Sequence, residues 1–195
     1  MSLAFGYCPF YCEENAILAA QSLAARGFEC NIVFVSNALK CVPLWRMRNG
    51  NKAMNGAIAY DYHVLCVARQ PDQAWRVVDL DFDDDGVSDD GFVAFETYCE
   101  RALLRVRVQY AREFRIVSLA EIESEFRSDR SHMRDKERPD EWLAAPPQWP
   151  VLFDSTTSNL FERFVDMRAS DGVGVVLTQE EFERRFTTQE NNETG

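Results

Sequence analysis

The sequence predicts a single α+β domain over residues 1–195, with a polar tail from about residue 188. Helical and strand-like patterns are mixed along the chain, and no repeat or linker separates them. A hydrophobic fraction of 46% and 14 Phe residues supply enough large apolar side chains for one substantial core. We therefore expect one globular unit rather than a string of small domains.

Periodic and capping signals predict the helices. Apolar residues recur with a helical period after Cys12 and stop at Gly27. Ser-x-x-Glu at residues 118–121 and Thr-x-x-Glu at residues 178–181 are capping boxes, which open helices. We expect helices over residues 12–26, 92–105 and 160–167, after residue 118 and after residue 178.

Short apolar segments bounded by turn residues predict the strands, which we expect to form a mainly antiparallel sheet. The clearest is residues 58–68, followed by a turn at Pro71 and a returning strand over residues 75–81. The expected strands are residues 31–36, 42–45, 58–68, 75–81, 114–117 and 172–177.

A symmetric hairpin around Pro71 pairs Leu65 with Val77 and His63 with Asp79. Opposed residues in antiparallel strands have Cβ atoms about 4.5–5.5 Å apart, a gap that an imidazole and a carboxylate can bridge by a hydrogen bond. An Asp that orients a His in this way is what a cysteine nucleophile requires. Asp61 and Asp81 lie on the same face as rival partners, and a shift of one residue in register would separate the pair. The alternative is a half-buried His that a nearby carboxylate merely satisfies.

Cys12 stands where the first predicted helix begins. Unpaired backbone N–H groups and the positive end of the helix dipole both favour a thiolate there. We therefore expect Cys12 to be a nucleophile. The alternative is a small buried apolar residue without chemistry.

The net charge of −11 and the pI of about 4.7 argue against nucleic acid or an anionic membrane as the main partner. No apolar run approaches membrane-spanning length, and the opening Met-Ser-Leu-Ala lacks the pattern of a signal peptide. We expect a reducing, cytoplasmic compartment in which all six cysteines are free thiols.

Metal sites are poorly supported by the sequence. Cys8 and Cys12 are separated by three residues, which fits neither a redox Cys-x-x-Cys motif nor a usual zinc knuckle. A zinc site from these two cysteines with His63 and His132 is the alternative that the residue types allow. Residues 81–86 resemble the start of an EF-hand loop, but its twelfth position is Phe92 where a bidentate Glu is required. We interpret this segment as an acidic loop.

Several short motifs occur together in a fixed order along the chain. They are Tyr-Cys-Glu-Glu-Asn at residues 11–15, Val-Ser-Asn at 35–37, Asp-Tyr-His-Val at 61–64, Asp-Leu-Asp at 79–81, Ser-Asp-Arg-Ser-His-Met at 128–133 and the closing segment 174–186. In these motifs the chain resembles the protein N-terminal glutamine amidohydrolase family, over nearly its whole length.

The resemblance implies a catalytic triad of Cys12, His63 and Asp79 in a single catalytic domain. It implies a three-layer α-β-α fold related to transglutaminases and papain-like enzymes, with no metal and no cofactor. The implied reaction is deamidation of an N-terminal Gln of a protein or peptide to Glu, through a cysteine thioester and with release of ammonia. A monomer in the cytoplasm, and also in the nucleus, is the implied state.

Recognition of the substrate's α-ammonium requires a carboxylate near the nucleophile. The candidates are Glu13, Glu14, Asp61 and Asp129. The alternative for the two glutamates is a favourable interaction with the first turn of the helix. We expect His132 to organise its loop and not to act as a second base.

The chain departs from the family pattern at two places. Tyr60 replaces a Trp before Asp-Tyr-His-Val, and strand alternation puts it on the face opposite His63, so we expect it to affect packing only. The acidic stretch at residues 83–90 is longer and more charged than the resemblance predicts.

Two other functions fit the same residues. A transglutaminase or papain-like thiol enzyme would use the same triad but form an isopeptide or cut the chain. A non-catalytic binder of protein N-termini would not need Cys12.

Overall fold

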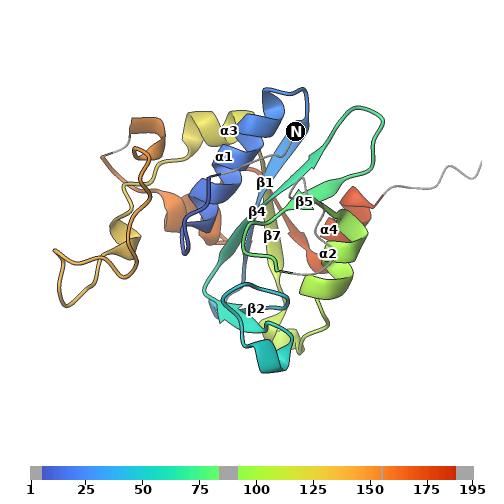
Figure 1. The fold of residues 1–195 in the computed structure, drawn as a ribbon, viewed down its shortest axis with the longest axis horizontal. Helices are drawn as coiled ribbons and strands as arrows, with labels where there is room; N and C mark the ends of the chain where they lie inside the picture. Colours follow the sequence, from blue (N-terminus) through green and yellow to red (C-terminus); the bar gives the residue numbers. More distant parts are fainter. Residues whose placement is uncertain (1–5, 84–91, 155, 188–195) are drawn as a thin grey trace, which may run out of the picture.

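The computed structural model describes residues 6–83, 92–154 and 156–187, and a six-stranded sheet forms its centre (Figure 1). Neighbouring strands in this sheet pair antiparallel, which confirms the predicted α+β class. In spatial order the strands are β6 (Val93–Ala94), β5 (Arg76–Val78), β4 (His63–Arg69), β1 (Glu29–Ser36), β7 (Glu113–Ser118) and β8 (Val175–Thr178). A separate two-stranded sheet pairs β2 (Val42–Leu44) with β3 (Ile58–Tyr60).

Helices cover both faces of the central sheet, which gives the expected three layers (Figure 1). One face packs against α1 (Cys12–Ala24), α3 (Leu119–Glu125) and the π-helical segment η5 (Leu160–Val165). The other face packs against α2 (Phe95–Ala102) and α4 (Gln179–Phe186). The short 3₁₀ segments are η1 (Lys52–Met54), η2 (Val108–Tyr110), η3 (Ser131–Met133) and η4 (Leu152–Asp154).

Strand β1 divides the two cores because its side chains alternate between the faces. Ile32 and Phe34 pack in the core beneath α1, whereas Val33 and Val35 pack in the core beneath α2 and α4. All four are fully buried, as expected for a central strand with both faces covered.

Both predicted capping boxes are present. The hydroxyl of Ser118 accepts from the Glu121 N–H, and the Glu121 carboxylate accepts from the Ser118 N–H. Thr178 and Glu181 repeat this exchange at the start of α4. These local signals placed the starts of α3 and α4 correctly.

The predicted strand over residues 58–68 is wrong as one continuous strand. It breaks at Asp61 and Tyr62, so that β3 pairs with β2 and only β4 joins the central sheet. The hairpin register is also shifted by two residues, because Val77 pairs with Val67 and not with Leu65.

The turn explains the shift in register. The N–H of Gln73 donates to the carbonyl of Gln70, with Pro71 at the second position and Asp72 at a φ of 61°. This is the φ that the third position of a type II turn requires. The observed register centres the loop on Asp72, one residue after Pro71, so each pairing partner moves by two residues. A shift of two residues leaves every side chain on its predicted face.

Three other predicted elements differ in extent. The returning strand ends at Val78, the segment after Phe92 forms β6 before α2 begins, and residues 160–165 are π-helical. The polar tail from residue 188 and the acidic residues 84–90 lie outside the described residues, whereas Asp83 is described and exposed.

All six cysteines are unpaired, as predicted. Within the described ranges, the chain forms no helix long and apolar enough to cross a membrane.

The aromatic core beneath α4 gives a first prediction. Phe182 is fully buried and stacks on Phe114 with ring centroids 4.3 Å apart. Phe182→Ala should lower the free energy of unfolding by about 3–5 kcal/mol, because it removes a large apolar side chain and leaves a cavity. Denaturant unfolding measures the change. Val108→Ala is the control, since Val108 is 89% exposed, and an equal loss in both variants would contradict the packing described.

Candidate active site

Helix α1 places Cys12 at its first residue, against strand β4. Asn15 fixes the preceding loop, because its side chain accepts from the Cys8 N–H and donates to the Cys8 carbonyl, both at 2.9 Å. Tyr11 is fully buried, and its hydroxyl donates to the carbonyl of Ala144. The thiol is therefore held at a helix start, as the sequence predicted.

His63 and Asp79 form the predicted hydrogen bond. The distance from His63 Nε2 to Asp79 Oδ2 is 2.8 Å, and both side chains are almost completely buried. The hydroxyl of Tyr98 donates to the same carboxylate oxygen at 2.7 Å, and the Asp81 N–H donates to the other oxygen at 3.1 Å. The Asp79 carboxylate therefore fixes the imidazole ring, and the other two groups fix the carboxylate.

Each member of the pair changes the pKa of the other. Burial alone would lower the pKa of His63, but the Asp79 carboxylate raises it above its ordinary value. Burial alone would raise the pKa of Asp79, but His63 and the donors around it hold that pKa below its ordinary value. Asp79 is therefore ionised at neutral pH, and it stabilises a proton on His63.

A pocket of about 200 Å³ opens beside these residues. Its volume is below the roughly 300–1,000 Å³ of drug-sized sites, so it suits a single small group. Its polar lining is contributed by Cys12, Asn49, Tyr60, Asp61, Tyr62, His63, Asp81 and His132.

The apolar wall of this pocket extends to the surface. Phe10 and Leu143 line the pocket and are 53% and 64% exposed. Phe161 lies between this pocket and a larger one of about 430 Å³, which has neither cysteine nor histidine in its lining. The smaller pocket is therefore the candidate active site.

Unpaired polar atoms gather at this pocket. In the described part of the chain, four buried side-chain atoms lack a hydrogen bond: Tyr60 Oη, His63 Nδ1, His132 Nδ1 and Glu13 Oε1, the last of which lies 3.2 Å from His132 Nε2 in an ion pair. Three of these residues line the pocket, and Glu13 lies next to Cys12. Buried polar groups without hydrogen-bond partners are costly and rare in native structures, so this cluster is typical of a binding site whose ligand supplies the missing partners.

Tyr60 belongs to the site, which corrects the prediction that it affects packing only. Its ring stacks on the His63 ring with centroids 5.0 Å apart and an interplanar angle of 19°. The prediction failed because strand alternation does not continue through the break at Asp61 and Tyr62.

The environment of Cys12 differs from that of an isolated helix start. Burial, together with the carboxylates of Glu13 and Asp81, raises the pKa of the Cys12 thiol well above its ordinary value. The dipole argument predicted a thiolate, but it did not account for these neighbours. The resting residue is therefore a thiol, which would need a base to become a thiolate.

The four carboxylates proposed for substrate binding occupy different places. Asp61 lines the pocket and is exposed. Glu13 is buried and is not part of the pocket lining, Glu14 is buried in an ion pair with Arg130, and Asp129 accepts from the Ser131 N–H.

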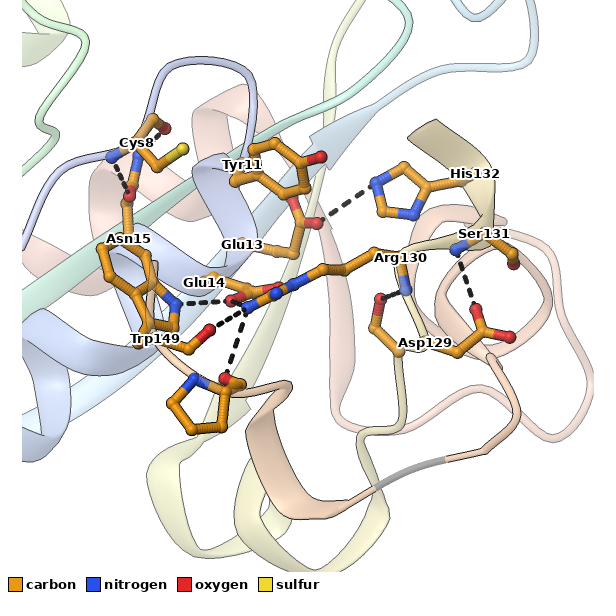
Figure 2. Close-up of polar contacts among 12 residues, drawn as sticks. Cys8, Tyr11, Glu13, Glu14, Asn15, Asp129, Arg130, Ser131, His132 and Trp149 are labelled. Atoms are coloured by element: carbon orange, nitrogen blue, oxygen red, sulfur yellow. Dashed lines mark hydrogen bonds and ion pairs between the residues drawn. The ribbon is translucent and has the colours of Figure 1, made fainter. Parts of the chain in front are cut away.

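The pair between Glu14 and Arg130 connects α1 to the loop that carries His132 (Figure 2). Arg130 Nε and Nη2 donate to the two Glu14 oxygens at 2.6 and 2.8 Å, and Trp149 Nε1 donates to Glu14 at 2.6 Å. Nη2 also donates to the carbonyls of Trp149 and Pro150. This bidentate contact holds two distant segments against the start of α1.

Comparison with known proteins connects this geometry to a family. The family model described as N-terminal glutamine amidase matches residues 7–186 of the chain. The chain belongs to this family. Relatives named "Protein N-terminal glutamine amidohydrolase" occur in Drosophila willistoni (34% identity, over 95% of this chain and 90% of the relative). A relative of the same name from Caenorhabditis briggsae is 31% identical over 93% of this chain and 95% of the relative. Another from Arabidopsis thaliana is 33% identical over 86% of this chain and 77% of the relative.

Sequence reasoning missed three features of this candidate site. Tyr98 gave no signal, because a tyrosine on an amphipathic helix is usually a core residue. The contact between Tyr60 and His63 depends on the strand break. His132 was assigned to its loop, although its place in the Ser-Asp-Arg-Ser-His-Met motif and its pairing with Glu13 mark it as part of the site.

The structure does not form the zinc site that the residue types allowed. In the part of the chain that the structure describes, the cysteines at 8 and 12 do not group with the histidines for a metal. The group that does form is His63, Asp79 and Asp81, whose ligand atoms lie within 4.8 Å of one another. In it, His63 Nε2 already contacts Asp79, and Asp81 accepts from the Tyr7 hydroxyl at 2.7 Å.

The contact of Arg130 with Glu14 gives a second prediction. Arg130→Met should lower the free energy of unfolding by about 3–5 kcal/mol, because the buried Glu14 carboxylate loses its cation. The double variant with Glu14→Leu should recover part of this loss. Denaturant unfolding of the wild type, the Arg130→Met and Glu14→Leu single variants and the double variant measures both effects.

Arg138→Met is the matched control in the same loop, since the Arg138 side chain is 65% exposed. No measurable change is expected there. An Arg130 variant as stable as this control would contradict the role given to the pair.

Proposed function

We propose that the chain hydrolyses the side-chain amide of an N-terminal glutamine in proteins and peptides, leaving glutamate and releasing ammonia. The observation that carries this proposal is the cluster of unpaired polar atoms around the pocket that Cys12 and His63 both line. The names of the relatives support the choice of substrate.

The first step is attack by Cys12, with His63 as the base. A carboxylate can only accept hydrogen bonds, so His63 Nε2 carries the hydrogen that faces Asp79. In the neutral ring Nδ1 is then an acceptor, and it is the atom without a partner. It takes the proton from the Cys12 thiol as Sγ bonds to the carboxamide carbon. Backbone N–H groups at the start of α1, including that of Cys12, stabilise the oxyanion.

The second step releases ammonia and the third restores the enzyme. His63 Nδ1 returns its proton to the amide nitrogen, the C–N bond breaks, and ammonia leaves a thioester on Cys12. Water then loses a proton to His63 and adds to the thioester carbon. When the C–S bond breaks, the sulfur recovers that proton, and glutamate is the product. Asp79 orients His63 and stabilises its charged form throughout.

The pocket walls support a peptide N-terminus as the substrate. Asp61 offers a carboxylate at the pocket for the α-ammonium, whereas Asp81, whose carboxylate lies within 4.8 Å of His63 and Asp79, belongs to the end of the pocket that holds His63. The exposed side chains of Phe10 and Leu143 provide apolar surface where the rest of the peptide would leave the pocket. Of the other candidates, Glu14 is already paired with Arg130, and Asp129 is not part of the lining.

The remaining properties are proposed from the resemblance. We propose one catalytic domain over residues 1–195 that acts as a monomer in the cytoplasm, and also in the nucleus. We propose that it works without metal or cofactor and does not use nucleic acid or membrane as a partner.

Mass spectrometry of a peptide that begins with Gln tests the reaction. The wild type should convert its N-terminal carboxamide to a carboxylate, a gain of about one mass unit, and Cys12→Ser should not, because it lacks the thiol nucleophile. Peptides with internal Gln or N-terminal Asn should not change, and treatment with a chelator should leave the rate unaltered.

Other products would point to other functions. Cleavage or crosslinking would keep the triad and discard the substrate, in favour of a papain- or transglutaminase-like enzyme. No change in any peptide would overturn the proposal and favour a binder of N-termini.

Asp79→Asn tests the role of the pair through pH. His63 must be neutral to accept the thiol proton, so kcat/KM falls as the pH drops through the raised pKa of His63. Removing the Asp79 carboxylate removes the largest cause of the increase, to which Asp81 and Glu13 also contribute, so the acid limb should move to lower pH. The maximal rate should fall by about 10²–10⁴-fold, because the ring loses its orienting partner.

Tyr98→Phe is the comparison, because it removes a donor to Asp79 but keeps the carboxylate. Its acid limb should not move to lower pH. An acid limb that stays in place in Asp79→Asn would mean that His63 is not the base.

A further inference from the structure

The two histidines of the chain occupy matching positions around the pocket. Each lines it, and each is buried with Nδ1 lacking a hydrogen bond. Each also has Nε2 against a carboxylate, since His63 Nε2 is 2.8 Å from Asp79 and His132 Nε2 is 3.2 Å from Glu13. The mechanism uses only the first of these two pairs.

The His132 ring is held firmly in place. Its side chain is 7% exposed, its Nε2 lies 3.4 Å from the Tyr62 hydroxyl, and its ring meets the edge of Phe161. Arg130, two residues earlier, fixes the same loop to α1 (Figure 2). A side chain fixed by this many contacts can place one nitrogen accurately.

Hydrogen-bond accounting assigns the free nitrogen of His132. Glu13 accepts only, and the Tyr62 hydroxyl donates its hydrogen to Glu13 at 3.2 Å, so Nε2 of His132 carries the hydrogen that faces them. Nδ1 of the neutral ring is then an acceptor that is buried and without a partner. It therefore requires an N–H or O–H donor from whatever enters the pocket.

An N-terminal glutamine brings two kinds of N–H donor, the carboxamide and the α-ammonium. The carboxamide nitrogen must face His63 Nδ1, which protonates it as it leaves. Asp81 lies within 4.8 Å of His63 and Asp79 and so belongs to that same end of the pocket. Tyr60 stacks on His63 and so lies at that end as well. Among the other lining residues with acceptor atoms, Asp61 offers an exposed carboxylate and His132 an unpaired Nδ1 for the α-ammonium.

We propose that His132 is a positioning and specificity residue whose Nδ1 accepts a hydrogen bond from the α-ammonium of the substrate, beside Asp61. This inference rests on the proposed function and adds to it the group that recognises a free N-terminus. The contact fixes how far the carboxamide carbon can lie from Cys12, because both ends of one glutamine are then held.

The test compares two substrates in three proteins. The substrates are a peptide that begins with Gln and its desamino analogue, the same peptide without the α-amine, and ammonia release gives kcat/KM for each. His132→Ala should lose about 10- to 100-fold on the amine-bearing peptide, mainly through KM, and little on the analogue, because only the first can make the bond. His132→Asn should recover much of the loss, because its amide oxygen can take the place of Nδ1.

Two further measurements separate positioning from folding. The rate at which iodoacetamide alkylates Cys12, and the melting temperature, should be close to wild type in His132→Asn. His132→Gln is a second control. Its amide reaches the position of Nε2 and not that of Nδ1, so, like His132→Ala, it should lose the preference for the amine-bearing peptide over the desamino analogue.

Three results would contradict the role of His132 or the proposed function. Equal losses on both substrates would make His132 part of the general chemistry or the fold, and no loss on either would remove it from the site. Both overturn the inference and leave the proposed function intact. A wild type that releases no ammonia from the Gln peptide would overturn the proposed function as well.

Discussion

The buried hydrogen bond between His63 and Asp79 is the interaction on which the site depends. Placing an imidazole and a carboxylate in an apolar core is costly, and each is tolerated because the other, with Tyr98, satisfies it. The bond also leaves Nδ1 of His63 as the nitrogen available for proton exchange. One contact therefore fixes the ring, its tautomer and the direction of its chemistry.

Long-range contacts bring the rest of the site to this ring. Helix α1 carries Cys12 to strand β4, and the buried pair of Glu14 with Arg130 holds the loop of His132 against the same helix. Adjacent residues of α1 thus have separate tasks, because Glu13 faces His132 while Glu14 holds Arg130 (Figure 2). The chain uses consecutive polar residues at a helix start to join segments more than 100 residues apart.

The sequence was sufficient to predict what depends on local patterns. The start of α1 at Cys12, the capping boxes of α3 and α4, and the antiparallel class all follow from short-range signals. The contact of His63 with Asp79 was predicted from a register that was two residues off. The predicted contact is still correct, because a shift of two residues keeps both side chains on one face, where diagonal neighbours are within reach of each other.

What could not be predicted depends on where the chain departs from regular structure or meets itself at a distance. The break after Tyr60 brings its ring onto His63, and alternation gives no warning of it. The raised pKa of the Cys12 thiol comes from burial and from Glu13 and Asp81, which a helix-dipole argument omits. Sequence thus indicated the candidate reactive residues, and only the three-dimensional contacts indicated how their protons are held.

The central claim is that Cys12 forms a covalent thioester, and partitioning with hydroxylamine tests it most directly. The wild type is incubated with an N-terminal Gln peptide and increasing hydroxylamine, and the products are separated by mass. We expect the hydroxamate to replace glutamate as the hydroxylamine concentration rises, because hydroxylamine and water compete for one thioester. Glutamate as the sole product at every hydroxylamine concentration, with ammonia still released, would contradict it and indicate direct attack by water.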